Sequence, residues 1–302
     1  MMPSIALARG NVLLSLMLAG GLATAGPPAS TNFSYSVAPL YHFDSGLEDG
    51  GKAGFAGVFT SLGGSWKLGG GSSLGMRLSF DYEDWRFDEP QGFGGLTPWT
   101  NLYRLGVSLP YSYATEDGWL LSLTPTLMYS GESDADFSKA LEYGATATLA
   151  RKFGPDLTLG LGVAAFARIE ETKVFPFLIV NWNITDRLRL TNPFAAGPAG
   201  PAGLELAYRL DGDWEAGLGA TYRSYRQRLA EDGPFPDGVG ENQYIPVYVH
   251  VGRNLTDTIK LRLYAGAALG GQLRVENEAG DRLYEEDQDP AAMLGLALIG
   301  RF

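Results

Sequence analysis

The sequence predicts an all-β protein, a transmembrane antiparallel β-barrel of about fourteen strands, with twelve as the alternative count. Three observations lead to this prediction. Apolar and polar residues alternate in segment after segment, the connections alternate between short and long, and aromatic residues collect at the segment ends. Together these features are typical of outer-membrane barrels, which have short periplasmic turns and longer external loops.

Residues 1–25 are typical of a secretory signal peptide. One positive charge, Arg9, precedes an apolar run from Val12 to Ala19, and Ala23-Thr24-Ala25 forms a small-x-small cleavage motif. The run is shorter than the roughly 18–20 residues of a spanning helix, so a transmembrane anchor is the weaker alternative. We therefore expect cleavage after Ala25 and a single outer-membrane barrel domain over residues 26–302.

Strict alternation with a period of two identifies the strands. Within 72–87, for example, Leu74, Met76 and Leu78 share one face, and Arg77 and Ser79 share the other. Repetition of this pattern indicates strands with one apolar and one more polar face. A change of face near Gly63-Gly64 predicts a β-bulge. The predicted strands are 31–43, 53–68, 72–87, 101–113, 119–130, 141–153, 157–169, 173–184, 187–193, 203–211, 214–227, 242–255, 258–273 and 290–302.

The connections alternate in length along the chain. Gly, Pro and Asp dominate the short ones, as in Gly154-Pro155-Asp156 and Asp211-Gly212-Asp213. The longer ones are 88–100, 131–140, 194–202, 228–241 and 274–289. An even strand count places both termini on the short-turn side, as this fold requires.

Aromatic residues mark both ends of the strands. This placement predicts two girdles, one at each membrane interface. The alternative is that Tyr and Trp simply favour strands. Beside the short turns lie Trp66, Tyr111, Tyr113, Trp119, Phe153, Trp182, Trp214 and Phe302; toward the long loops lie Tyr41, Tyr82, Tyr103, Tyr129, Tyr143, Tyr208 and Tyr222.

Composition excludes several classes of protein. There is no cysteine, so a lipoprotein anchor, disulfides and Cys-based metal sites are excluded. The net charge of −11 argues against nucleic-acid binding, which needs basic patches. We expect neither a cofactor nor a metal site. A soluble β-sandwich would also alternate, but it would not usually combine this alternation with two aromatic girdles and alternating loop lengths.

Charged residues on the polar faces are the candidate lumen lining. With much Gly, Ala, Ser and Thr around them, they predict a water-filled pore that leans mildly toward anions. The alternative is a closed lumen crossed by salt bridges. The candidates are Arg77, Asp81, Glu83, Arg104, Lys152, Glu205, Arg209, Glu215, Arg223, His250, Lys260 and Arg262.

These features favour a passive, porin-like channel of low selectivity for small polar solutes, a monomer in the cell outer membrane. The alternative is a non-conducting structural or surface-interaction barrel. A lipid-modifying enzyme is a third hypothesis, but hydrolysis needs a serine held beside a histidine base. The sequence has two histidines, His42 and His250, and lacks the His-x-Ser-Asn-Gly arrangement of outer-membrane phospholipases, so we expect no enzyme and no catalytic residue.

Partners follow from the same location. Carboxylates in the long loops, such as Glu285-Glu286-Asp287, are suited to share divalent cations with lipopolysaccharide. The alternative is that they are solvated loops that resist aggregation. The expected partners are outer-membrane lipids and lipopolysaccharide, the barrel-assembly machinery and small polar solutes.

Three stretches resemble a family of uncharacterised bacterial outer-membrane barrels, classed under a domain of unknown function. They are residues 39–44 (PLYHFD), 241–247 (ENQYIPV) and 265–276 (AGAALGGQLRVE), followed by the closing Gly300-Arg301-Phe302. The resemblance implies a barrel in the outer membrane and supplies no substrate or catalytic residue. In size the chain is also similar to small monomeric porins and to the longer hydrocarbon and fatty-acid transporters.

The last residue, Phe302, stands in register with Leu294, Leu296 and Leu298 on the apolar face of the final strand. In outer-membrane barrels as a family, a C-terminal aromatic residue is recognised by the assembly machinery. The resemblance therefore implies that Phe302 is an assembly signal.

Overall fold

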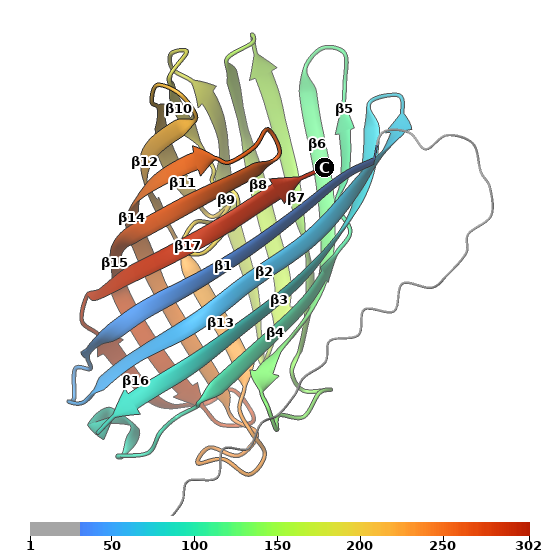
Figure 1. Ribbon diagram of the computed structural model, residues 1–302. Helices are drawn as coiled ribbons and strands as arrows, with labels where there is room; N and C mark the ends of the chain where they lie inside the picture. Colours follow the sequence, from blue (N-terminus) through green and yellow to red (C-terminus); the bar gives the residue numbers. More distant parts are fainter. Residues whose placement is uncertain (1–30) are drawn as a thin grey trace, which may run out of the picture.

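The computed structural model describes residues 31–302. The expected signal peptide, residues 1–25, lies outside the described residues, as does its cleavage site. The described chain forms one antiparallel sheet that closes into a barrel, because β1 (Thr31–Gly46) pairs with β17 (Ala291–Arg301) (Figure 1). The expected all-β barrel is confirmed.

Within residues 31–302, seventeen strands form fourteen segments that cross the wall, which we call staves, because three of these segments each contain a break. β4 and β5 both pair with β3 and β6, β12 and β13 both pair with β14, and β16 and β17 both pair with β15. The predicted count of fourteen is therefore confirmed. The remaining bounds are β2 (Lys52–Gly69), β3 (Ser72–Asp88), β4 (Asn101–Ser108), β5 (Tyr111–Ala114), β6 (Trp119–Glu132), β7 (Leu141–Phe153), β8 (Leu157–Arg168), β9 (Glu171–Asn183), β10 (Leu188–Thr191), β11 (Gly203–Arg209), β12 (Trp214–Thr221), β13 (Arg223–Arg228), β14 (Val239–Asn254), β15 (Ile259–Glu276) and β16 (Arg282–Gln288).

Proline marks two of the breaks. Pro110 lies between β4 and β5, and Pro290 lies between β16 and β17. A proline has no N–H to give to the ladder, so pairing stops there while the stave continues. Within residues 31–302 the sole helical element is the 3-10 turn η1 (Gln91–Phe93), and no helix there is long and apolar enough to span a bilayer.

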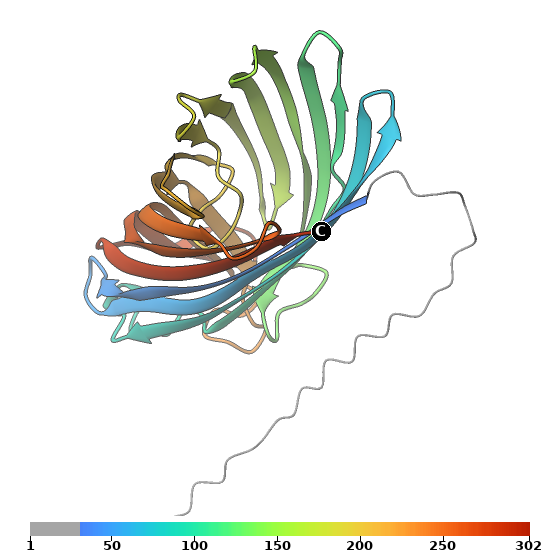
Figure 2. The same ribbon diagram turned by 45° about the horizontal axis from the view of Figure 1, so that its top comes forward.

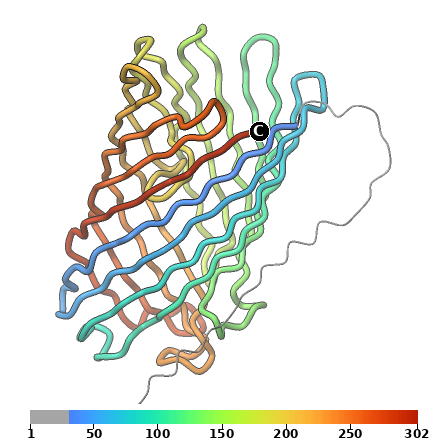
Figure 3. Tube along the Cα trace, in the orientation of Figure 1, coloured from blue at the N-terminus to red at the C-terminus, as the bar shows by residue number. Residues whose placement is uncertain are grey.

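The two faces of the wall follow the period of two. On β3, Leu74, Met76 and Leu78 point outward with 40–41% of their surface exposed, whereas Glu83 and Trp85 point inward and are buried. The strands are tilted relative to the barrel axis (Figure 3). Similar outward side chains on the other strands form an apolar exterior. Such an exterior suits hydrocarbon, and the inward positions are left for polar groups.

The two ends of the barrel differ in their connections. At one end, the short-turn end, the connections are 70–71, 115–118, 154–156, 184–187, 210–213 and 255–258, and the C-terminus lies there at the top of Figure 1. At the opposite, long-loop end they are 47–51, 89–100, 133–140, 169–170, 192–202, 229–238 and 277–281. The predicted alternation therefore holds except at residues 169–170, where β8 and β9 are joined by a tight turn.

The bulge predicted at Gly63-Gly64 is wrong. β2 pairs with β1 and β3 through both glycines without a register shift, and the irregularity of the β1–β2 pair falls instead between His42 and Ser45. The apparent change of face came from Phe55 and Phe59, whose rings pack inside the barrel. The alternation rule assigns apolar residues to the outer face, so it misplaces an apolar residue that lies on the inner face.

Three further expectations need correction. β15 continues to Glu276 and β16 follows, so the connection expected over 274–289 is reduced to 277–281. β16 has charged residues on both of its faces, so its sequence does not alternate between apolar and polar residues. Tyr208 lies beside the short turn 210–213 and not toward the long loops. The loop expected outside at 194–202 folds into the barrel (Figure 2).

β13 changes the shape of the long-loop end. Tyr222 separates it from β12, and its last residue, Arg228, pairs with Gly131 of β6. In the sheet order, β7 to β12 lie between these two strands, and all six stop before the contact. Fewer staves therefore surround the long-loop end than the short-turn end.

We expect deletion of Phe302 to reduce assembly severalfold. Its ring is 67% exposed and stacks on Tyr35 at 5.6 Å, and its backbone exchanges two hydrogen bonds with Phe33. The deletion removes the last rung between the first and last staves, which closes the wall. The measurement is the amount of heat-modifiable folded barrel in isolated outer membranes. Phe153→Ala is the matched control, because this ring is also exposed at the short-turn end. An equal loss in both variants would contradict a special role for Phe302.

Candidate functional site

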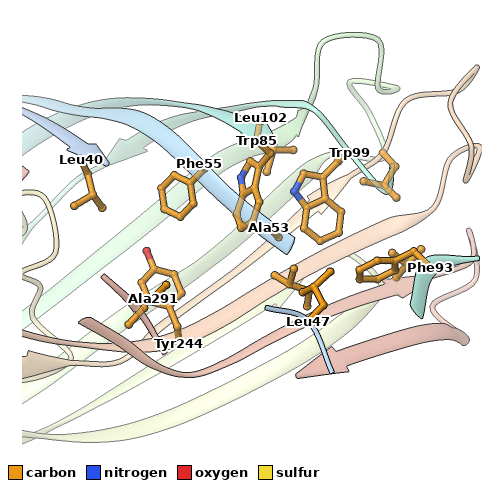
Figure 4. Packing of buried hydrophobic residues seen from close by; sticks show 14 of the residues in the cluster. Leu40, Leu47, Ala53, Phe55, Trp85, Phe93, Trp99, Leu102, Tyr244 and Ala291 are labelled. Atoms are coloured by element: carbon orange, nitrogen blue, oxygen red, sulfur yellow. The ribbon is translucent and has the colours of Figure 1, made fainter. Parts of the chain in front are cut away.

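The half of the interior near the long loops contains a solid apolar cluster, which we call the inner core. Inward side chains of β1, β2, β3, β4, β14, β15 and β17 meet residues of loops 89–100 and 229–238 there (Figure 4). Its buried members are Leu40, Leu47, Ala53, Phe55, Trp85, Phe93, Trp99, Leu102, Leu229, Phe235, Tyr244, Ala268, Leu273, Val275, Ala291 and Met293.

Aromatic contacts join opposite walls through the inner core. Phe55 of β2 stacks on Trp85 of β3 at 4.8 Å between ring centroids. His42 of β1 stacks on Phe55 at 4.9 Å and meets the edge of Tyr244 of β14 at 5.8 Å. Because the two walls touch through these rings, no passage runs between them at this level.

Three predicted lumen residues form a buried cluster beside the inner core. The Arg104 guanidinium donates to Glu83 and lies 3.7 Å from Asp81. The guanidinium also lies 4.1 Å from the centre of the Tyr225 ring on β13, which only β6 separates from β4 at the long-loop end. A buried charge is tolerated when it is paired and hydrogen-bonded, and Nη2 of Arg104 meets both conditions, whereas its Nε and Nη1 make no hydrogen bond within residues 31–302. The cluster therefore fastens β3 and β4 to β13.

A second charged group, the outer charge layer, closes the long-loop end above β7 to β9. Arg226 lies 3.3 Å from Glu241, which stands directly opposite on β14, and it also donates to Glu276 of β15. Its Nε donates to the carbonyl of Ile169 at the β8–β9 turn, at 2.8 Å. The layer thus binds the tip of the β8–β9 hairpin to the outward face of β13. Its members are Glu142, Arg168, Arg226, Glu241, Arg274 and Glu276.

The connection between β10 and β11 enters the barrel and occupies its middle. We call residues 192–202 the inward loop. Its Ala196 and Ala199 are buried against Ala38 of β1, Tyr248 of β14 and Ala297 of β17. At its base, the Asn192 side-chain amide donates to the carbonyls of Leu178 at 3.0 Å and Gly203 at 2.9 Å.

Two further predicted lumen residues hold the inward loop in place. Arg223 donates to the carbonyls of Gly197, at 2.9 Å, and Ala199. Arg77 lies over the Phe194 ring, with its guanidinium carbon 5.2 Å from the ring centre. Gly197 has a φ of +58°, which lets the loop turn back tightly toward the wall. These arginines bind the loop and are not free to line a pore.

Two adjoining cavities, together the vestibule, open at the short-turn end. Their volumes are about 360 and 530 Å³, and both are lined by Arg189, Asn254 and Lys260. Pro193 and Phe194 of the inward loop line the first cavity. The vestibule is therefore bounded on one side by the inward loop.

The remaining predicted residues mostly gather at the vestibule. Glu205 accepts from Tyr248 at 3.1 Å and lies 3.2 Å from His250 Nε2 and 3.4 Å from Arg262. Glu215 pairs with Lys260 at 2.8 Å and with Arg262 at 2.7 Å. Arg209 lines the second cavity, and Lys152 is exposed near Gly118, away from this group.

The inner face of β6 and β7 differs from the wall opposite. Ser122, Thr124 and Thr126 of β6 and Thr146 and Thr148 of β7 point inward and remain half-buried. On the opposite wall, inward residues such as Ala38 and Ala297 are fully buried. The solvent-accessible part of the interior therefore follows the hydroxyl-rich wall, which we call the open wall.

Neither histidine has the surroundings of a hydrolytic base. His42 lies among the rings of the inner core, and His250 lies beside Glu205 and Tyr264. No hydrogen bond joins either imidazole to a serine within residues 31–302. The surroundings of the two histidines therefore give no support to the enzymatic hypothesis.

Lys139 ties three external connections together above the barrel. Its Nζ donates to Asp237 at 2.9 Å and to Glu278 at 2.8 Å, which joins loop 133–140 to 229–238 and 277–281. Hydrogen bonds to Glu278 and Asp237 raise the pKa of Lys139 above its usual range. Hydrogen bonds from Ser138 lower the pKa of the nearby Asp136. These loops are thus ordered by their own charges.

Arg226, Glu241 and Glu276 are important charges that sequence reasoning missed. In chain register, Arg226 shares a face with Tyr222, whose ring is exposed on the exterior. At Arg226 the β8–β9 turn covers that face, and the sequence around Arg226 does not predict this contact. The signal available was the charge itself, since two residues of a short strand, Arg226 and Arg228, stand on a face expected to be apolar.

One family model and several solved structures are similar to this chain. The family model described as "Domain of unknown function (DUF6268)" matches residues 73–299. No curated protein matches the chain in sequence. Among solved structures, a COG4313 outer membrane channel from Pseudomonas putida F1 is 11% identical with a TM-score of 0.49, covering 95% of this chain and 100% of that one. The toluene transporter TodX from Pseudomonas putida is 11% identical with a TM-score of 0.41, covering 91% and 90%. At this level of similarity, neither the solute nor the solute path of those proteins can be inferred for this chain.

We expect Arg226→Met to lower the free energy of unfolding by about 3–5 kcal/mol, because it removes from a buried charge network the arginine that pairs with both Glu241 and Glu276. The measurement is equilibrium unfolding by denaturant in detergent micelles. Arg187→Met is the control, since Arg187 pairs with Asp211 at the surface and such pairs contribute about 1 kcal/mol or less. Equal losses in the two variants would show that the outer charge layer does not stabilise the barrel.

We expect Arg223→Met to release the inward loop. Two hydrogen bonds from a charged donor are lost, each contributing about 1.5–3 kcal/mol. Hydrogen exchange of residues 194–201 should accelerate at least about tenfold, since 1.4 kcal/mol corresponds to a factor of ten. Arg209→Met, an inward arginine that makes no contact with the loop, should leave this exchange unchanged. An unaltered exchange rate in Arg223→Met would mean that the loop is held by its apolar contacts alone.

Proposed function

This chain belongs to the DUF6268 family, and we propose that it is a passive channel of the outer membrane for small polar solutes, with low selectivity. The solute path follows the open wall of β6 and β7 from the vestibule. The inward loop and the outer charge layer bound this path. The protein is proposed to act as a single barrel.

One observation carries this proposal, namely the unequal filling of the interior. The β1–β3 and β14–β17 walls meet in the inner core, whereas Thr124, Thr126 and Thr148 on the open wall are half-buried. Hydroxyl side chains can replace the water around a polar solute and bind it only weakly. A barrel that served only as a scaffold would have no need to leave one wall accessible.

The exterior supports a membrane location. Outward residues such as Leu161 and Leu218 are exposed, and exposed aromatic residues, among them Trp182 and Trp214, stand beside the short turns. An apolar band with aromatic residues at the interface is what a transmembrane barrel presents to lipid. With the expected signal peptide, this exterior favours the outer membrane, with the short turns in the periplasm.

The filled long-loop end favours a second candidate, a non-conducting structural or surface-interaction barrel. There the inner core and the outer charge layer block the direct route to the outside. In that case the ordered external loops around Lys139 would be the functional part. Conductance decides between the two candidates.

We expect Thr148→Cys to place a reactive thiol in the solute path. The chain has no cysteine, so a single introduced thiol reports on one position only. A positively charged, water-borne thiol reagent should modify Thr148→Cys and lower the conductance of the purified protein in a planar bilayer. Ala297→Cys, on the buried opposite wall, should remain unmodified and should conduct as before.

Two results would contradict the proposed channel. A bilayer that stays silent for the wild-type protein would favour the non-conducting barrel. Equal modification of both thiols would show that the interior is accessible on every side, as in a wide general pore.

A further inference from the structure

Among the described residues 31–302, three inward arginines of the vestibule have no carboxylate partner. Arg189 lines both cavities, Arg301 lines the first and Arg209 lines the second. None of the ion pairs within residues 31–302 includes any of the three. In the outer half of the barrel the pattern is the opposite, since Arg104, Arg168 and Arg226 are all paired.

The buried carboxylates beside the vestibule are not available to neutralise these arginines. Glu205 is held by Tyr248, His250 and Arg262. Glu215 is held by Lys260 and Arg262. Two carboxylates are thus already balanced by two cations, and the three arginines add positive charge to a water-filled recess.

Aspartates of the short turns are the other charges nearby. Asp156, Asp186 and Asp213 line the second cavity, and Asp257 lines the first. All four lie in turns and are exposed at the rim. Charges in bulk water are strongly screened beyond about 8 Å at physiological salt, whereas charges inside a recess are screened less. Arg189, Arg209 and Arg301 are exposed as well, but they belong to strands whose inward face lines the recess, whereas the aspartates belong to the turns.

We propose that the vestibule is a binding site for small organic anions that carry a carboxylate or phosphate group. Arg189 stands where the two cavities meet, and its planar fork matches an anionic group in two hydrogen bonds. Asn254, which lines both cavities, supplies an uncharged amide beside it. Volumes of about 360 and 530 Å³ admit a solute of metabolite size. The proposal deepens the proposed channel by naming its preferred solute class.

Charge selectivity in a planar bilayer is the first test, and this arm rests on the proposed channel. Under a potassium chloride gradient, the reversal potential of the wild-type protein should show a preference for chloride. The triple variant Arg189→Gln/Arg209→Gln/Arg301→Gln should lower the chloride-to-potassium permeability ratio by about threefold or more, because a ring of like charge concentrates counter-ions. The control is Arg151→Gln/Arg253→Gln, since these arginines stack on Trp119 and Trp214 on the exterior of the same end. It should keep the wild-type ratio.

Calorimetric titration of the full barrel in nanodiscs with inorganic phosphate is the second test, and it needs no conductance. We expect saturable binding that Arg189→Gln weakens at least about tenfold, a loss of about 1.4 kcal/mol. The exterior double variant should bind as the wild type does. Conductance without anion preference, or phosphate binding that survives in the triple variant, would overturn the anion site and leave the channel standing. A silent bilayer with arginine-dependent phosphate binding would overturn the channel and leave the anion site standing.

Discussion

Pairing between β1 and β17 closes the wall, and the rest of the structure depends on that closure. From Ser34↔Arg301 to His42↔Met293 the first and last staves share one register. Within a bilayer each unpaired backbone group would cost several kcal/mol, so a spanning sheet must join its two edges. Once closed, the wall has one apolar face for lipid and one inner face where every charge of the strands must be solvated or paired.

The inner face meets this demand in three different ways. Toward the long loops, aromatic rings from opposite walls exclude water, and the arginines there are bound to carboxylates. In the middle, the inward loop offers backbone carbonyls to Arg223. At the short-turn end, water in the vestibule solvates the arginines that remain unpaired. Along the barrel axis the interior therefore changes from packed rings at the long-loop end to open cavities at the short-turn end.

The strands of the barrel wall could be predicted from the sequence, whereas the packing inside the barrel could not. The fourteen staves and the outward faces follow from the period of two, which is a property of each strand alone. The inner core could not be predicted from that period. Phe55 and Phe59 are apolar residues on the inward face, and only their contacts with other strands explain why they lie there. The inward loop has the composition of an ordinary surface loop, and its course depends on partners that are distant in sequence, such as Arg223 beside its carbonyls and Ala38 beside its alanines. Arg104, Glu83 and Asp81 were identified as inward residues from alternation, but their role in joining β3 and β4 to β13 depends on the contact of Arg104 with Tyr225, which no strand pattern shows.

Methionine oxidation of the unaltered protein tests the unequal interior most directly. Met128 on β6 and Met293 on β17 both point inward, but Met128 is half-buried on the accessible side whereas Met293 is 2% exposed in the inner core. After brief exposure to hydrogen peroxide, peptide mass spectrometry should find sulfoxide at Met128 and not at Met293. Oxidation of both residues at similar rates would contradict the division of the interior into a packed and an accessible side.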